Sequence, residues 1–181
     1  MLTKFIKNEK IRTVVSWILS IGLALAVGFF VAKFFIATAV VNEKSMEPTL
    51  YAGERIFVNK LSYAFKEPKR GDVVAFLPNN NKDKYYIKRI IGLPGDEIDI
   101  YDGSIYINGE KYEGKINQYT RPGNIMNYPY KVPENSYFVV GDNREFSEDS
   151  RYFEVGCVPL ENIAGKALLR FFPLNKIKII S

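Results

Sequence analysis

A long uncharged segment near the N-terminus limits the possible folds of this chain more than any other feature. Residues 14–31 contain no charged side chain, and after Lys33 the chain stays apolar as far as Val41. About 20 apolar residues span a bilayer as a helix, and a lysine near the helix end can extend its amine to the interface. The sequence therefore predicts a transmembrane helix over residues 14–36.

The charge distribution gives this helix a direction. Residues 1–36 carry a net charge of +4 out of the chain's +5, so the remainder is nearly neutral. Basic residues collect on the cytoplasmic side of a membrane helix. We therefore expect a cytoplasmic segment at residues 1–13 and an extracytoplasmic domain at residues 37–181. A nucleic-acid-binding domain, which needs a basic face of its own, is not expected.

A secretory signal peptide that is later removed is the alternative for this segment. Ala37-Thr38-Ala39 resembles a small-residue cleavage site. The apolar run, however, is longer than the usual core of about 7–15 residues in a signal peptide. We favour an uncleaved anchor, and self-cleavage at this site stays open.

The rest of the chain is typical of a β domain. Asp102-Gly103 and Asn108-Gly109 separate alternating runs and predict two-residue hairpins. Some 140 residues can bury one core, which favours a β-sandwich or distorted barrel. The predicted strands are residues 54–59, 72–77, 85–91, 97–101, 104–107, 110–112, 136–140 and 164–172.

Three further features complete this prediction. Residues 59–65 indicate a short helix, and residues 114–135 show little periodicity and are expected to be irregular. Cys157 is the single cysteine, so no internal disulfide can form. With no histidine and a single cysteine in the chain, no metal cluster is expected.

A serine and a lysine are the candidates for nucleophilic chemistry. Ser45 follows the apolar segment, and Lys88 lies in a predicted strand between Tyr86 and Ile90 on the same face. A serine hydroxyl needs a base, and without histidine the base must be a carboxylate or a neutral lysine. Burial on the strand face lowers a lysine pKa. Each residue alone also fits a plain structural role, as a turn serine or a solvent-facing lysine.

A third segment, residues 141–151, packs acids, bases and hydroxyls closely after the predicted strand at residues 136–140. Such density indicates a network of hydrogen bonds and ion pairs. A structural corner without a catalytic part fits the same residues.

Taken together, the motifs resemble bacterial type I signal peptidases of the compact Gram-positive kind. They occur in family order from the N-terminus to about residue 170. After the anchor they are Ser45-Met46-x-Pro48-Thr49-Leu50, Arg70-Gly71-Asp72-Val73-Val74, Tyr86-x-Lys88-Arg89-x-Ile91-Gly92-x-Pro94-Gly95-Asp96, and Gly141-Asp142-Asn143-Arg144-x-x-Ser147-x-Asp149-Ser150-Arg151.

The resemblance implies a membrane-anchored serine endopeptidase that removes signal peptides from exported preproteins after small-x-small sites. Its partners are preprotein signal peptides and membrane lipid, and it needs no cofactor or metal. Ser45 is implied as the nucleophile and Lys88 as the general base. The supporting roles that the resemblance implies are a hydrogen bond from Ser147 to the lysine amine, pairing of Asp149 with Arg89 and Arg151, structural roles for Asp142 and Arg144, and contact of the substrate strand with Tyr86 and Ile87.

One position departs from some relatives, which have a serine two residues before the nucleophile to help bind the oxyanion. Here that residue is Glu43, which cannot donate a hydrogen bond when ionised. The second oxyanion donor is therefore open.

Other readings of the whole chain are weaker. An inactive anchored β module that binds exported chains has no reason to keep both Ser45 and Lys88. A self-cleaving Ser/Lys repressor-type protease would need a DNA-binding domain and no anchor. Endoplasmic-reticulum-type signal peptidases have histidine where Lys88 stands.

Overall fold

The computed structural model describes residues 9–79, 84–125 and 127–181, without the side chains of residues 30–34. Most of the predicted cytoplasmic segment and the predicted interfacial position of the Lys33 amine therefore lie outside the described residues. The chain forms two compact units, Met1–Ala37 and Thr38–Ser181. We describe each unit by itself.

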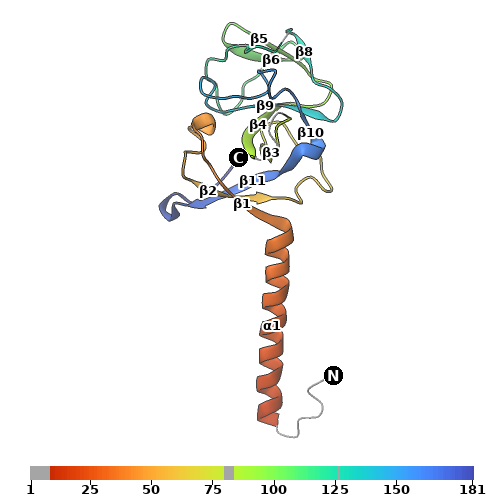
Figure 1. Cartoon of the computed structure of the whole chain (residues 1–181), viewed down its shortest axis with the longest axis vertical. Helices are drawn as coiled ribbons and strands as arrows, with labels where there is room; N and C mark the ends of the chain where they lie inside the picture. The colour runs from red at the N-terminus through yellow and green to blue at the C-terminus, as the bar shows by residue number, and fades with distance from the viewer. Residues whose placement is uncertain (1–8, 80–83, 126) are drawn as a thin grey trace. The chain divides into compact units, whose positions relative to one another are not determined.

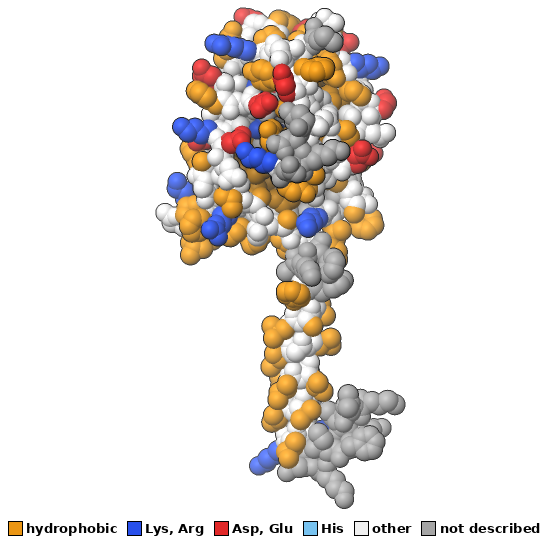
Figure 2. Space-filling model, in the orientation of Figure 1, with side chains coloured by type: hydrophobic (Ala, Val, Ile, Leu, Met, Phe, Trp, Pro, Cys, Tyr) orange, Lys and Arg blue, Asp and Glu red, His pale blue; other side chains and the backbone are white. Residues whose placement is uncertain are grey.

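The first unit contains helix α1 (Glu9–Phe35). Its stretch Glu9–Phe29 has a mean hydropathy of 1.8 and none of it is buried, so it is long and apolar enough to cross a membrane. Trp17 and Leu25 are 67% and 69% exposed, and Figure 2 shows hydrophobic side chains along the helix. The predicted apolar helix is present, but the apolar residues after Phe35 form a strand instead of more helix.

The second unit is mainly β, as predicted (Figure 1). Its larger sheet has eight strands. The strand order is β1-β2-β11-β3-β4-β9-β10, with β12 paired to β11. The strands are β1 (Ile36–Val40), β2 (Arg55–Asn59), β3 (Val73–Phe76), β4 (Tyr86–Gly92), β9 (Ser136–Val140), β10 (Val158–Pro159), β11 (Ile163–Phe172) and β12 (Lys178–Ile179).

The smaller sheet has four antiparallel strands in the order β7-β6-β5-β8. They are β5 (Glu97–Tyr101), β6 (Ser104–Ile107), β7 (Glu110–Lys111) and β8 (Tyr130–Lys131). Both predicted hairpins are confirmed. Asp102 and Gly103 have φ of 47° and 68°, and Asn108 and Gly109 have φ of 53° and 83°. Positive φ at both central residues is the geometry that Asp-Gly and Asn-Gly favour in two-residue turns.

Helical structure in this unit is confined to the short turns η2 (Lys44–Met46), η3 (Leu160–Asn162) and η4 (Leu174–Lys176) among the described residues. The helix predicted at residues 59–65 is wrong, because β2 continues to Asn59 and residues 60–64 form turns. The Asn59 side chain accepts a hydrogen bond from the Leu61 amide at 2.9 Å, a contact that favours a turn over a helix. The described residues in the range 114–135, that is 114–125 and 127–135, are irregular as predicted, apart from β8.

Strand β4 lies between two hydrophobic clusters. Ile91 packs with Phe138 and Val140 on one face, and Ile90 packs with Phe76 and Val139 on the other. Because successive side chains of a strand point to opposite faces, Lys88 lies on the Ile90 face and Arg89 on the Ile91 face. This alternation sends the two basic side chains to different partners.

Candidate active site

Ser45 lies in the η2 turn between β1 and β2, and its side chain is buried. The loop that follows β9 makes hydrogen bonds to the backbone of this turn. The Asn143 amide donates to the Ser45 carbonyl at 3.0 Å, and the Asn143 side-chain nitrogen donates to the Lys44 carbonyl at 3.2 Å. A residue 98 positions further along the chain thus fixes the backbone of the serine.

Lys88 approaches the serine from strand β4, where it pairs with Val74 of β3. Its side chain is 2% exposed, and Lys88 Nζ donates to Ser45 Oγ at 2.7 Å. Burial lowers the pKa of Lys88 because the ammonium form loses its hydration, and the nearby Arg151 lowers it further. The charges of Asp149, Glu43 and Glu148 act in the opposite direction. A neutral amine at this distance can accept the serine proton.

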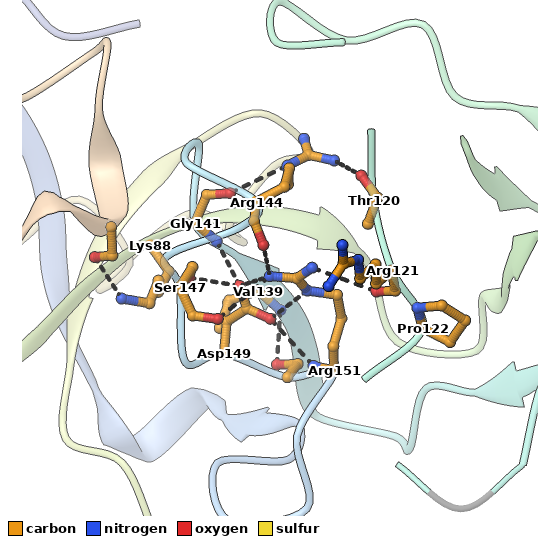
Figure 3. A network of polar contacts seen from close by, with 12 residues as sticks. Lys88, Thr120, Arg121, Pro122, Val139, Gly141, Arg144, Ser147, Asp149 and Arg151 are labelled. Carbon is orange, nitrogen blue, oxygen red and sulfur yellow. Dashed lines mark hydrogen bonds and ion pairs between the residues drawn. The ribbon is translucent and has the colours of Figure 1, made fainter. Parts of the chain in front are cut away.

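The loop after β9 is organised around the buried Asp149 (Figure 3). Its carboxylate accepts hydrogen bonds from the Gly141 amide at 2.9 Å and the Ser147 hydroxyl at 2.6 Å. Arg151 donates to the same carboxylate through Nε at 2.8 Å and Nη2 at 2.9 Å. The Asp149–Arg151 pair is therefore present as the resemblance implies.

Two expected contacts are wrong and need correction. Arg89 pairs with Asp142, not with Asp149, through Nε–Oδ1 and Nη2–Oδ2 contacts of 2.8 Å each. The reason is the strand alternation, which points Arg89 away from the face that carries Lys88. The Ser147 hydroxyl donates to Asp149 and makes no hydrogen bond to Lys88 among the described residues.

Arg144 connects this loop to the irregular segment that precedes β8. Its guanidinium is buried and donates to the Gly141 carbonyl at 3.1 Å and to Thr120 Oγ1 at 2.9 Å (Figure 3). It also donates to the Ile116 carbonyl at 3.2 Å. Burial and the neighbouring Arg151 lower its pKa. Arg144 thus orders a stretch of chain that has little regular structure of its own.

Tyr86 and Ile87 lie at an open strand edge. On one side, β3 pairs with β4 from Tyr86 to Arg89, whereas on the other side β9 pairs only from Arg89 onward. Within the described parts of the chain, residues 86–88 therefore have a strand partner on one side alone. Beside this edge is a cavity of about 30 Å3, whose lining includes Ser45, Lys88, Tyr86 and Ile87.

Sequence reasoning missed an ion pair at the same cavity. Lys84 Nζ lies 2.6 Å from Glu43 Oε1, and both residues line the cavity together with Ser45 and Lys88. The hydrogen bond from Lys84 lowers the pKa of Glu43, so its carboxylate is ionised. No local pattern could have indicated this pair, because its members are 41 residues apart.

The site is not the largest hollow of the molecule. A cavity of about 540 Å3 is lined by residues that include Thr49, Arg89, Arg170 and Lys176, but neither Ser45 nor Lys88. In the part of the chain that the structure describes, no group of three or more acidic or cysteine side chains could hold a metal ion. The chemistry that the small cavity offers is that of a buried serine hydroxyl in hydrogen-bond contact with a buried lysine amine.

Comparison with known proteins gives consistent matches. The sequence pattern of the family described as "Signal peptidase, peptidase S26" matches residues 14–172. The chain is 38% identical to a probable signal peptidase I-2 of Synechocystis sp. (strain PCC 6803), over 88% of this chain and 73% of the relative. It is 34% identical to signal peptidase IB of Staphylococcus aureus (strain COL), over 92% and 94%. A signal peptidase I structure from Enterococcus faecalis V583 is 35% identical and covers 56% of this chain and 97% of its own, with a TM-score of 0.47.

Proposed function

The chain belongs to the signal peptidase family, peptidase S26, membrane-anchored serine endopeptidases that cleave signal peptides from exported preproteins, and we propose that Ser45 is its nucleophile and Lys88 its general base. The observation that carries this assignment is the 2.7 Å contact between Lys88 Nζ and Ser45 Oγ, made by two buried side chains. No histidine exists to serve as the base.

The reaction starts from the neutral form of Lys88. The Ser45 hydroxyl donates its proton to Nζ while Oγ attacks the carbonyl carbon at the end of the signal peptide. The resulting ammonium then protonates the leaving amide nitrogen, which breaks the peptide bond and leaves an ester on Ser45. After the new amine has left, Lys88 takes a proton from water while the water oxygen attacks the ester carbonyl. The ammonium then returns this proton to Ser45 Oγ as the ester bond breaks, and the signal peptide leaves as a carboxylic acid that ionises in solution.

The oxyanion of each tetrahedral intermediate needs hydrogen-bond donors. The backbone amide of Ser45 is our first donor. The Glu43 side chain is excluded as the second, because its ionised carboxylate only accepts hydrogen bonds and already binds Lys84.

The supporting residues act by position. Asp149 holds the loop backbone at Gly141, and Ser147 and Arg151 in turn hold Asp149. Arg89 and Asp142 lock β4 to the start of the same loop. These contacts hold the Lys88 amine and the Ser45 hydroxyl in position during the reaction.

The substrate adds as an extended strand along the open edge of β4 at Tyr86 and Ile87. The cavity of about 30 Å3 between this edge and Ser45 leaves room for a small side chain only. This supports cleavage after small-x-small sequences such as Ala-x-Ala.

The anchor holds the domain on the outer side of the membrane in this proposal. Positive charge before the helix favours a cytoplasmic N-terminus. The basic residues there are Lys4, Lys7, Lys10 and Arg12. Accessibility of the domain to external protease in sealed cells tests this orientation.

Cleavage of a preprotein by Ser45→Ala and Lys88→Met variants tests the dyad. Each variant should lose processing by about 10³-fold or more while its circular dichroism spectrum stays that of a folded domain. Substantial turnover by folded Lys88→Met protein would show that another group takes the proton.

A further inference from the structure

Two side-chain bridges join the same two segments of the chain, and all four of their residues line the small cavity. One is the Lys88–Ser45 hydrogen bond of 2.7 Å. The other is the Lys84–Glu43 ion pair of 2.6 Å. Glu43 precedes Ser45 by two residues, and Lys84 precedes Lys88 by four, so the second bridge lies further from the dyad along both segments.

The segments that these bridges connect form the walls of the cavity. One wall is the stretch from Val40 to Met46, and the other runs from Lys84 to Lys88 along the open edge of β4. A substrate strand has to lie between them if the proposed function holds, and the inference rests on that function. Residues two apart in an extended strand point to the same side and lie roughly 7 Å apart. The second small side chain of a small-x-small sequence then falls on the side of Glu43 and Lys84.

We propose that the Glu43–Lys84 ion pair determines specificity by fixing the distance between the two walls at the outer end of the groove. The pair excludes large side chains at the small position furthest from the scissile bond. The position next to the scissile bond depends on the dyad end of the cavity instead.

The ion pair is exposed, so it can act on specificity while it contributes little to the stability of the fold. Lys84 is 46% and Glu43 52% exposed, and exposed ion pairs contribute little to stability. Variants of either residue should therefore fold. Screening by salt weakens exposed pairs, so high ionic strength should loosen this specificity in the native protein.

The test measures cleavage of three peptides by the full chain in detergent: Ala-x-Ala, Leu-x-Ala and Ala-x-Phe. Native protein should prefer Ala-x-Ala over Leu-x-Ala, and Glu43→Gln or Lys84→Gln should reduce this ratio of kcat/KM about threefold, the size of effect that an exposed ion pair can supply. Rejection of Ala-x-Phe should be unchanged. Using a ratio at one pH removes any effect of the Glu43 charge on Lys88, which acts equally on all peptides.

Two control proteins sharpen the result. The charge-reversed double variant Glu43→Lys/Lys84→Glu rebuilds the pair and should recover the native ratio. Lys60→Gln removes an exposed lysine outside the cavity and should change nothing. An unchanged ratio in both single variants, or a double variant that stays relaxed, overturns the proposal.

A binding measurement separates this inference from the proposed function. The same variants, made in a Ser45→Ala background, are titrated with fluorescent Ala-x-Ala and Leu-x-Ala peptides. A Kd ratio that falls about threefold when the pair is broken supports the role of the pair, and an unchanged Kd ratio overturns it. Cleavage that persists in Ser45→Ala protein defeats the Ser45–Lys88 mechanism, while the Kd ratios still decide the ion pair.

Discussion

Arg89 and Asp142 form a buried ion pair with two parallel hydrogen bonds of 2.8 Å each. Their side chains are 3% and 0% exposed. Thr49, four residues after Ser45, donates to the second oxygen of Asp142 at 2.5 Å, and Arg89 also donates to the Gly71 carbonyl at 2.7 Å. One ion pair thus connects the strand of Lys88, the segment of Ser45 and the loop after β9.

Breaking this pair should lower the free energy of unfolding of the domain more than a substitution of an exposed side chain does. Asp142→Asn leaves a buried guanidinium without its counter-charge, which costs about 3–5 kcal/mol. The loss in free energy of unfolding is measured by urea titration, followed by far-ultraviolet circular dichroism. Glu110→Gln, which removes an exposed carboxylate from β7, is the matched control and should stay within about 0.5 kcal/mol of the native value. Equal stability of the two variants would contradict the structural role of Asp142.

Gly141 packs too closely against the site to carry a side chain. A Cβ atom there would lie 2.1 Å from Ser147 Oγ and 2.5 Å from the Ser45 carbonyl oxygen. Gly141→Ala should therefore displace the serine backbone and lower kcat/KM by about 10²-fold. Gly22→Ala in α1, where no atom lies within 4 Å of the added Cβ, should leave peptide cleavage unchanged. Native activity in Gly141→Ala protein would mean that the loop can move away at no cost.

The activity should rise with pH as Lys88 loses its proton. Burial lowers the pKa of Lys88, so the inflection in kcat/KM should fall below the value of about 10.4 for a solvated lysine. The measurement is kcat/KM for an Ala-x-Ala peptide across neutral and alkaline pH. A profile that is flat from acid pH upward, or an inflection at the solvated value, would exclude a buried lysine base.

The same pKa has a consequence for stability. Between the folded and unfolded pKa values of Lys88, the unfolded chain binds more protons, so stability rises with pH through this window. Below the window the buried ammonium destabilises the fold. Lys88→Met should therefore raise Tm at neutral pH while it abolishes cleavage, and the gain should shrink toward alkaline pH. A lower Tm for Lys88→Met at neutral pH would show that the native amine is well solvated or firmly paired.

The parts of the fold that were predictable from sequence are those with local causes. The uncharged apolar run over residues 14–31 is long enough to span a bilayer as a helix, and α1 contains it. Asp102-Gly103 and Asn108-Gly109 determine their hairpins through positive φ. Strands β8, β10 and β12 were missed because two residues each are too few for any alternation to show. Strand β1 was missed because its apolar residues continue the apolar run of the helix.

The structure brings together the side chains that the sequence singled out, but not all of their contacts could be predicted. Burial of Lys88 follows from its neighbours Tyr86 and Ile90 on one strand face. The partner of Arg89 did not follow, because Asp142 and Asp149 are both acids of one loop and only the loop's path decides which one meets the opposite face. The Glu43–Lys84 pair depends in the same way on chain paths between distant segments. Such contacts need the tertiary structure.

Removing the helix α1 should leave peptide cleavage intact if the shortened chain keeps strand β1. Strand β1 (Ile36–Val40) is an edge strand of the large sheet and pairs with β2, so a chain that begins at Ile36 keeps this edge covered. A chain that begins at Val41 exposes the edge of β2 and should aggregate more readily.

The Ile36 chain should cleave an Ala-x-Ala peptide but not its Ala-x-Phe variant, because the cavity of about 30 Å3 beside Ser45 cannot admit an aromatic ring. The measurements are light scattering of both truncated proteins and cleavage of both peptides by the soluble one. Equal rates for the two peptides would show that the walls of this cavity separate widely on substrate binding, and the small-residue specificity would then have to arise elsewhere.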